Sequence, residues 1–144
     1  MRARVKYFDE SLPPICYVGG KDMSNWIDLY TREETEIKEG EMKTIPLNVA
    51  IEIPSGYEVM MIPRSSTFKN YGVIMANSIG LFDESYCGDK DEYMFAAYAV
   101  KDTVIPKGAR VCQIRFIKRQ PDIEFERVEH LNEQSRGGFG STGV

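Results

Sequence analysis

Residues 45–54, Ile-Pro-Leu-Asn-Val-Ala-Ile-Glu-Ile-Pro, carry an apolar side chain at every odd-numbered position from 45 to 53. An apolar residue at every second position is typical of a β-strand with one face toward a core. The turn-forming residues Pro54-Ser55-Gly56 follow, and Tyr57, Val59 and Met61 then form a second alternating run. The two runs therefore predict an antiparallel β-hairpin.

Five further short segments are rich in β-branched and aromatic residues and are separated by Gly, Pro and Asp clusters. They are residues 3–7, 27–30, 94–100, 110–117 and 123–128. Only residues 65–71 favour a helix, because this polar stretch follows Ser and Thr capping residues. The sequence therefore predicts an all-β fold, a sandwich or barrel-like roll with one short helix.

Length and charge narrow the class of protein. The chain has 144 residues and a formal net charge of −4, which indicates one domain without the basic surface that nucleic acids require. No run of about 18 apolar residues could span a membrane, and residues 1–10 are too charged for a signal peptide. We expect a soluble, cytoplasmic protein with no membrane or nucleic-acid partner.

Cysteine and histidine usage limits the chemistry. Cys16, Cys87 and Cys112 match no metal-binding spacing, which favours a reducing compartment. His130 is the one histidine in the sequence, so histidine-rich zinc sites are excluded. If the protein is an enzyme, its carboxylates must carry the proton chemistry.

The segment Pro63-Arg64-Ser65-Ser66-Thr67 lies after a predicted strand, at the start of the predicted helix. Backbone N–H groups at a helix start, two hydroxyls and a guanidinium together favour a phosphate site. The alternative is an ordinary serine N-cap beside a surface arginine, which is the commoner use of this pattern.

Residues 77–88, Asn-Ser-Ile-Gly-Leu-Phe-Asp-Glu-Ser-Tyr-Cys-Gly, predict a hairpin whose tip is flanked by glycines. A free strand edge inside it could hydrogen-bond a planar base, and Asn77 adds an amide. Asp83 is a candidate to take a proton from water, and Tyr86 could pack on a sugar. A solvated turn carboxylate is the alternative for Asp83.

Two later segments give weaker signals. Residues 108–113 place Arg110 and Gln113 where a turn enters a strand, although polar residues are common on a strand's solvent face. Residues 132–144 are rich in glycine but lack the lysine of a P-loop. They predict an arm that closes over a bound anion with Phe139 as its aromatic anchor, and a frayed terminus is the alternative.

Taken in this order, the segments resemble the trimeric deoxyuridine triphosphatases (dUTPases), especially the form found in Gram-positive bacteria and their phages. The resemblance begins at residues 27–30, Ile-Asp-Leu-Tyr, and continues through residues 63–66, 77–88, 108–113 and 136–143. It implies a jelly-roll-like subunit of residues 1–131 in a homotrimer, with residues 132–144 as a flexible C-terminal arm that closes over an active site.

The resemblance also implies an activity and a role for each motif. The expected reaction is Mg²⁺-dependent hydrolysis of dUTP to dUMP and diphosphate, which keeps uracil out of DNA and supplies dUMP for dTMP synthesis. Asp83 would activate the water that attacks the α-phosphorus, and Tyr86 would exclude a 2′-hydroxyl. Asp28 would reach Mg²⁺ only through water, with no direct protein ligand to the metal. The other implied substrate-binding residues are Arg64, Ser65, Ser66 and Gln113 for phosphates, Asn77 and Gly80 for uracil, Arg136, Ser141 and Thr142 for terminal phosphates, and Phe139 for stacking on the base.

Four features depart from the family pattern. Trp26 and Ile27 precede Asp28, where the first motif usually has small residues. Only two glycines separate Arg136 from Phe139, and Cys87 stands where a basic residue is usual after the tyrosine. Residues 89–93, Asp-Lys-Asp-Glu-Tyr, are more acidic than the family pattern and resemble a short insertion.

Three alternatives are weighed against dUTP hydrolysis. A dCTP deaminase of the same fold would need a glutamate on the strand after the third motif, and residues 93–100 have none. A nucleotide-binding phage regulator would bind a repressor-type protein partner through its outer surface. A β-rich domain could also share the fold for packing alone.

Overall fold

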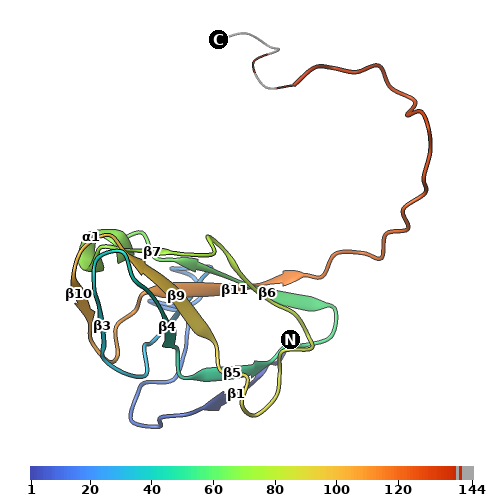
Figure 1. Cartoon of the computed structure of the whole chain (residues 1–144). Helices are drawn as coiled ribbons and strands as arrows, with labels where there is room; N and C mark the ends of the chain where they lie inside the picture. The colour runs from blue at the N-terminus through green and yellow to red at the C-terminus, as the bar shows by residue number, and fades with distance from the viewer. Residues whose placement is uncertain (139, 141–144) are drawn as a thin grey trace.

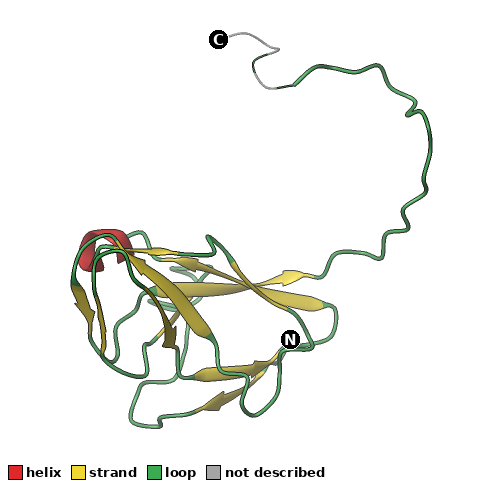
Figure 2. Cartoon of the chain, viewed as in Figure 1, coloured by secondary structure: helices red, strands yellow, loops and turns green. Residues whose placement is uncertain are grey.

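Short antiparallel strands form the body of the protein, with a helix at one end (Figure 1, Figure 2). The computed structural model describes residues 1–138 and 140. Its elements are β1 (Arg4–Tyr7), β2 (Ile27–Leu29), β3 (Thr35–Ile37), β4 (Met42–Pro46), β5 (Val49–Glu52), β6 (Tyr57–Pro63), α1 (Thr67–Tyr71), β7 (Val73–Met75), β8 (Gly80–Phe82), β9 (Met94–Ala99), β10 (Thr103–Ile105) and β11 (Cys112–Lys118).

The strands form four sheets with the orders β2-β11-β6-β8, β4-β9-β7, β1-β5 and β3-β10. All of the strand pairs are antiparallel, as a one-sided apolar pattern predicts. The sheets do not close into a barrel within the described residues. The expected all-β class with one short helix is confirmed, and no helix in the described residues is long and apolar enough to cross a bilayer.

The alternating run at residues 45–53 supplies the core but does not form one strand. Its five odd-numbered side chains are all buried, as predicted. Asn48, however, has a φ of 70°, a left-handed conformation that asparagine tolerates better than most residues, and it divides the run into β4 and β5. The Asn48 side chain accepts a hydrogen bond from the Asp9 N–H at 2.7 Å and donates to the Asp9 carbonyl at 3.1 Å.

The predicted hairpin between residues 45–53 and 57–61 is wrong. Strand β4 pairs with β9, β5 pairs with β1, and β6 pairs with β11 and β8. Alternation reports which face of a strand is buried, whereas the pairing partner is decided by contacts with distant segments.

The other local predictions have mixed outcomes. Residues 3–7, 27–30 and 94–100 contain β1, β2 and β9, residues 110–117 overlap β11, and residues 65–71 contain α1. The strand predicted at residues 123–128 is absent from the described chain, and residues 77–88 do not form a hairpin of their own. Within them only β8 is a strand; it pairs with β6 and lies at the edge of its sheet.

After β11 the chain leaves the body as a long extended arc (Figure 1). Residues 119–138 contain no strand or helix and are exposed throughout. Their apolar side chains include Ile123, Phe125, Val128 and Leu131, with Phe125 88% and Leu131 84% exposed.

Candidate active site

A cleft lined by polar side chains forms where β2, β11 and the end of β6 lie side by side. Gln113 on β11 lies opposite Asp28 on β2 and opposite Ile62 on β6. Arg64 and Ser65 follow β6 directly and complete this wall, and the loop of residues 18–24 forms the other. We call this the anion cleft, and its lining residues are Val18, Gly19, Met23, Ser24, Asp28, Arg64, Ser65 and Gln113.

Asp28 holds two guanidinium groups at the anion cleft. Its carboxylate is 3% exposed, with Oδ2 at 3.0 Å from Arg64 Nε and 3.4 Å from Arg110 Nη1. Burial raises the pKa of Asp28 above its ordinary value, although both arginines oppose this shift. Each guanidinium has five N–H donors, so donors remain for an anionic ligand.

The serines before α1 are not used as the simple capping interpretation requires. Ser66 stands at the N-cap position, yet no side-chain cap hydrogen bond is found there within the described chain. The Thr67 hydroxyl instead accepts from the Arg64 N–H at 3.0 Å and donates to the Val111 carbonyl at 2.6 Å. Thr67 therefore fixes the turn, and Ser66 occupies the N-cap position without a side-chain cap hydrogen bond.

A second cluster surrounds Asp83, which directly follows β8. Asp83 Oδ1 accepts hydrogen bonds from the Ser85 hydroxyl and from the Ser85 N–H, the latter at 2.8 Å. These bonds, led by the hydroxyl, hold the pKa of Asp83 below its ordinary value. Asp83 is therefore an exposed carboxylate that stays ionised at neutral pH and has a fixed direction.

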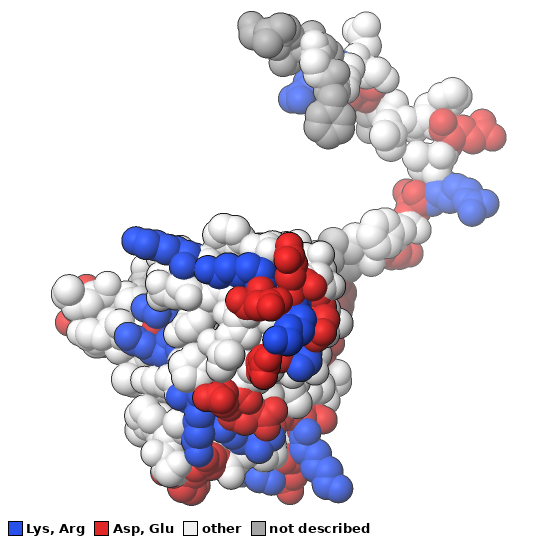
Figure 3. Space-filling model, turned by 60° about the vertical axis from the view of Figure 1, so that its left-hand side comes forward, with Lys and Arg blue, Asp and Glu red and all other residues white. Residues whose placement is uncertain are grey.

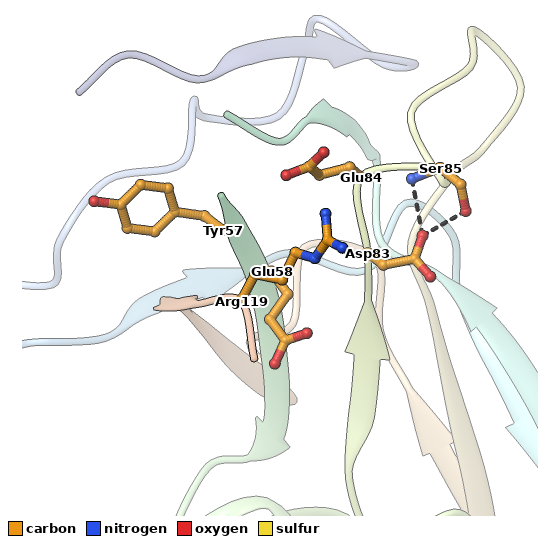
Figure 4. Close-up of a pocket in the computed structure, with 6 residues that line it drawn as sticks. All are labelled: Tyr57, Glu58, Asp83, Glu84, Ser85 and Arg119. Carbon is orange, nitrogen blue, oxygen red and sulfur yellow. Dashed lines mark hydrogen bonds between the residues drawn. The ribbon is translucent and has the colours of Figure 1, made fainter. Parts of the chain in front are cut away.

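The pocket beside Asp83 is acidic (Figure 4). Tyr57, Glu58, Asp83, Glu84, Ser85 and Arg119 line it. The Asp83 carboxylate turns toward Ser85, whereas Glu84 points the other way and accepts from the Gly56 N–H. Three carboxylates beside one guanidinium repel a triphosphate, so this pocket alone does not suit an anionic ligand.

The edge strand β8 and the loop after it contain the remaining residues of the third motif. Gly80 lies opposite Met61, and a Cβ there would approach the Met61 and Met75 Cε atoms to 3.1 and 3.2 Å. The Asn77 amide donates to the Ile79 carbonyl at 3.3 Å. The half-buried Tyr86 packs beside Phe82, with ring centroids 5.7 Å apart.

The predicted site residues thus form two clusters rather than one. Asp83 lies beside Glu58 near the start of β6, and Arg64 follows its end. Six residue steps along a strand span roughly 20 Å. One copy of the chain therefore does not bring Asp83 to the anion cleft.

The C-terminal arm contributes one described residue to the predicted site. Arg136 is exposed and belongs to residues 119–138, which contain no strand or helix. Phe139, Ser141 and Thr142 lie outside the described residues.

Sequence reasoning missed Ser85 and left Arg110 out of the predicted site. The spacing Asp-x-Ser after a strand is a signal for an Asx-type turn and could have pointed to Ser85. The pairing of Arg110 with Asp28, 82 positions away by 110 − 28, has no local signal. No group of three or more metal-ligating side chains is found within residues 1–138 and 140.

Comparison with known proteins decides the family. A family model described as dUTPase matches residues 23–143. The chain belongs to the dUTPase family. The SPbeta prophage-derived deoxyuridine 5'-triphosphate nucleotidohydrolase YosS of Bacillus subtilis is 48% identical over 144 residues, which covers 100% of this chain and 99% of that dUTPase. A deoxyuridine 5'-triphosphate nucleotidohydrolase of Finegoldia magna is 32% identical over 97% of this chain and 99% of its own length.

Solved dUTPase structures share the fold. A mutant dUTPase of Staphylococcus bacteriophage 80alpha with bound dUpNHpp matches with a TM-score of 0.80 at 19% identity, over 99% of both chains. A mutant dUTPase of phage phi11 of S. aureus, described with a structural Mg(II) ion, matches with a TM-score of 0.77 at 16% identity. That match covers 92% of this chain and 100% of the phi11 chain. The predicted family and fold are confirmed.

Proposed function

We propose that this dUTPase-family protein hydrolyses the Mg²⁺ complex of dUTP to dUMP and diphosphate. The observation that carries the proposal is Asp83, an exposed carboxylate held ionised by Ser85 at the position of the family's third motif. The reaction would keep uracil out of DNA and supply dUMP for dTMP synthesis. We further propose that the protein acts in the cytoplasm, where it would draw its substrate from the deoxynucleotide pool.

Asp83 acts as the general base. Its carboxylate takes a proton from a water molecule, whose oxygen forms a bond to the α-phosphorus of dUTP. The bond from that phosphorus to the bridging oxygen breaks, and diphosphate leaves. The low pKa of Asp83 keeps the base form available at neutral pH.

The anion cleft binds the phosphates. Arg64, Ser65 and Gln113 line the cleft, Arg110 reaches it through Asp28, and Ser66 is adjacent. Hydrolysis at phosphorus needs charge neutralisation and an oriented water rather than a covalent nucleophile, and these donors fit that need.

When bound as the complex of dUTP, Mg²⁺ would offset the charge of the triphosphate. Asp28 is the carboxylate nearest to the cleft, but its Oδ2 already faces Arg64 and Arg110. A carboxylate between two cations is a poor direct ligand for a third. Asp28 therefore fits a contact with Mg²⁺ through water.

Base and sugar are selected at β8. As an edge strand, β8 has one side without a neighbouring strand in the described chain, which suits hydrogen bonds from the Gly80 region to uracil. Asn77 adds its side-chain amide. The exposed part of Tyr86 packs on the deoxyribose and leaves no room for a 2′-hydroxyl.

We propose a homotrimer whose three active sites lie between subunits. The separation of roughly 20 Å along β6 supports this arrangement, because Asp83 of one copy would act on a nucleotide held in the anion cleft of another. The apolar side chains on the arc also need a second copy to cover them. In the proposed closed state, Arg136, Ser141 and Thr142 bind the terminal phosphates and Phe139 stacks on the base.

The alternatives predict other outcomes. Strand β9 carries no glutamate, so water activation at a cytosine ring has no candidate base there. A nucleotide-binding regulator with a repressor-type partner would bind the nucleotide at the same site but would not hydrolyse it.

The proposal is tested by measuring diphosphate release from dUTP, UTP, dTTP and dCTP, with Mg²⁺ and with a chelator. We expect Mg²⁺-dependent release from dUTP alone. Release of ammonia from dCTP would instead identify a deaminase. No product from any of the four substrates would favour the nucleotide-binding regulator.

A further inference from the structure

We infer that the ion pair between half-buried Arg32 and buried Glu92 positions Tyr86 and thereby sets the preference for deoxyribose over ribose. This inference rests on the proposed function, in which Tyr86 contacts the sugar. Neither Arg32 nor Glu92 lies in a motif that the resemblance carries. Glu92 belongs to residues 89–93, the acidic stretch that departs from the family pattern.

The ring and the hydroxyl of Tyr86 are both fixed. The hydroxyl donates to the main-chain carbonyl of Glu92 at 2.8 Å. The ring lies against Phe82 and Tyr93, with centroid distances of 5.7 and 6.2 Å. Phe82 and Tyr93 stack on each other at 3.8 Å, and Tyr93 is fully buried, so this aromatic support belongs to the core.

Glu92 is in turn fixed by its side chain. The carboxylate is 5% exposed and accepts hydrogen bonds from Arg32 Nε at 2.8 Å and Arg32 Nη2 at 3.0 Å. It also accepts from the Asn48 N–H at 2.9 Å. All of these donors come from segments far from Tyr86 in the sequence. The carbonyl that receives the Tyr86 hydroxyl is therefore tied to the core.

The backbone on both sides of this link is also anchored. The Arg32 N–H donates to the Pro46 carbonyl at 2.9 Å, and the Tyr93 N–H donates to the Val49 carbonyl at 2.8 Å. The Leu47 N–H donates to the Tyr93 carbonyl at 2.9 Å. The ion pair thus joins the linker between β4 and β5 to the loop that carries Tyr86.

The buried Glu92 carboxylate is costly to desolvate, and its pairing with half-buried Arg32 does not by itself increase stability over an apolar pair of similar size. Its geometry, however, is directional, because a bidentate arginine fixes a carboxylate in one orientation. Steric exclusion of one hydroxyl needs this kind of precision, because a ring displaced by about 1 Å admits the extra atom. Position rather than stability is therefore the property that the Arg32–Glu92 pair supplies to Tyr86.

The test compares kcat/KM for dUTP and UTP in the full-length protein. The variants are Arg32→Gln, Glu92→Gln, Tyr86→Phe and the double variant Arg32→Gln/Tyr86→Phe. Lys38→Gln is the matched control, because it breaks the surface Lys38–Glu36 pair on another sheet. Thermal unfolding of each variant checks the fold, and Glu92→Gln keeps the side-chain shape if Arg32→Gln proves unstable.

We expect Arg32→Gln to lower the dUTP/UTP ratio of kcat/KM at least tenfold and Glu92→Gln at least threefold, with Lys38→Gln unchanged. In the Tyr86→Phe background, Arg32→Gln should change the ratio less than twofold, because the hydroxyl link is already lost. Equal losses of kcat/KM for both nucleotides, or effects that multiply in the double variant, would show that the pair only supports the fold. A wild-type protein that fails to hydrolyse dUTP would instead overturn the proposed function, and this inference with it.

Discussion

Gln113 and Asp28 lie directly opposite each other across the antiparallel pair β2–β11. Opposed residues in an antiparallel pair point to the same face, so an amide and a buried carboxylate share one wall of the anion cleft. Arg64, at the end of the neighbouring strand β6, completes the wall through its contact with Asp28. The register of β2 and β11 thus brings two residues that are 85 positions apart in the sequence onto one polar surface.

This relationship predicts a strong effect of charge at Gln113. In Gln113→Glu a second carboxylate would oppose Asp28 and repel the α-phosphate, so we expect kcat/KM for dUTP to fall at least a hundredfold. Gln113→Met, which has similar size and no charge, should lose about tenfold. Steady-state diphosphate release checks both variants, and equal losses would contradict the electrostatic account.

The sequence predicted the buried face of the two alternating runs at residues 45–53 and 57–61, because alternation is a local property. Burial of the five apolar residues at 45–53 followed directly from their spacing. The register that places Gln113 beside Asp28 could not be predicted in this way, because it depends on contacts between distant segments. Strands β3, β7 and β10 are three residues each, too short for a periodic pattern.

The site was predicted through motifs and not through geometry. Resemblance identified Asp83, Arg64 and Gln113, yet no spacing indicated that they lie in two clusters of one chain. The strand expected at residues 123–128 has the right composition but contacts no sheet in this chain. Local composition indicates that a segment favours the extended conformation. A β-strand also requires a neighbouring strand with which to form hydrogen bonds.

A side chain at position 80 would have little room beside Met61 and Met75. A Cβ at Gly80 would lie within 3.3 Å of Met61 and Met75 side-chain atoms, which is tighter than ordinary contact. Gly80→Ala should lower the free energy of unfolding by about 1–3 kcal/mol, a typical penalty for overpacking. Gly138→Ala is the control, because a Cβ there meets nothing within 4 Å. Urea unfolding of both variants makes the comparison, and equal midpoints would refute the packing argument.

Variants at Asp83 and at its neighbour Glu84 distinguish a role as general base from a general effect of negative charge in the pocket. Asp83→Ala should bind a non-hydrolysable dUTP analogue with near-native affinity and lose hydrolysis at least a thousandfold. Glu84→Ala removes a carboxylate of the same pocket that points away from Asp83 (Figure 4), and it should keep turnover within about threefold. Calorimetric binding and diphosphate release test this pair. Hydrolysis by Asp83→Ala at the parent rate would exclude Asp83 as the base.

The hydrogen bond from the Ser85 hydroxyl to Asp83 predicts how kcat/KM depends on pH. It is the largest contributor that holds the pKa of Asp83 down, so the base form persists to lower pH than for an ordinary aspartate. Ser85→Ala removes this hydrogen bond and should raise the pKa of Asp83, which moves the acid limb of the kcat/KM profile to higher pH. Ser85→Thr keeps a hydroxyl and should leave the limb in place. An acid limb that stays fixed in Ser85→Ala would assign it to another group.

The surface charge of the body indicates why a cationic arm would help to bind a triphosphate. Acidic and basic side chains are interspersed on the face shown in Figure 3, with several carboxylates grouped where the arc departs. A triphosphate bound near such a surface needs added cationic and N–H donors, and Arg136 is an exposed cation on the arc.

Removal of residues 136–144 should therefore leave the fold intact and lower the turnover of dUTP. Within the described residues every buried core residue precedes the arc, so the melting temperature should stay within about 2 °C of the parent value. We expect kcat for dUTP to fall at least thirtyfold, because the donors that we propose to close over the phosphates would be lost. Arg136→Ala alone should account for at least threefold of that loss, whereas Arg127→Ala, a change at another exposed arginine of the arc, should have little effect. Unchanged kcat in the truncated protein would show that the arm takes no part in the reaction.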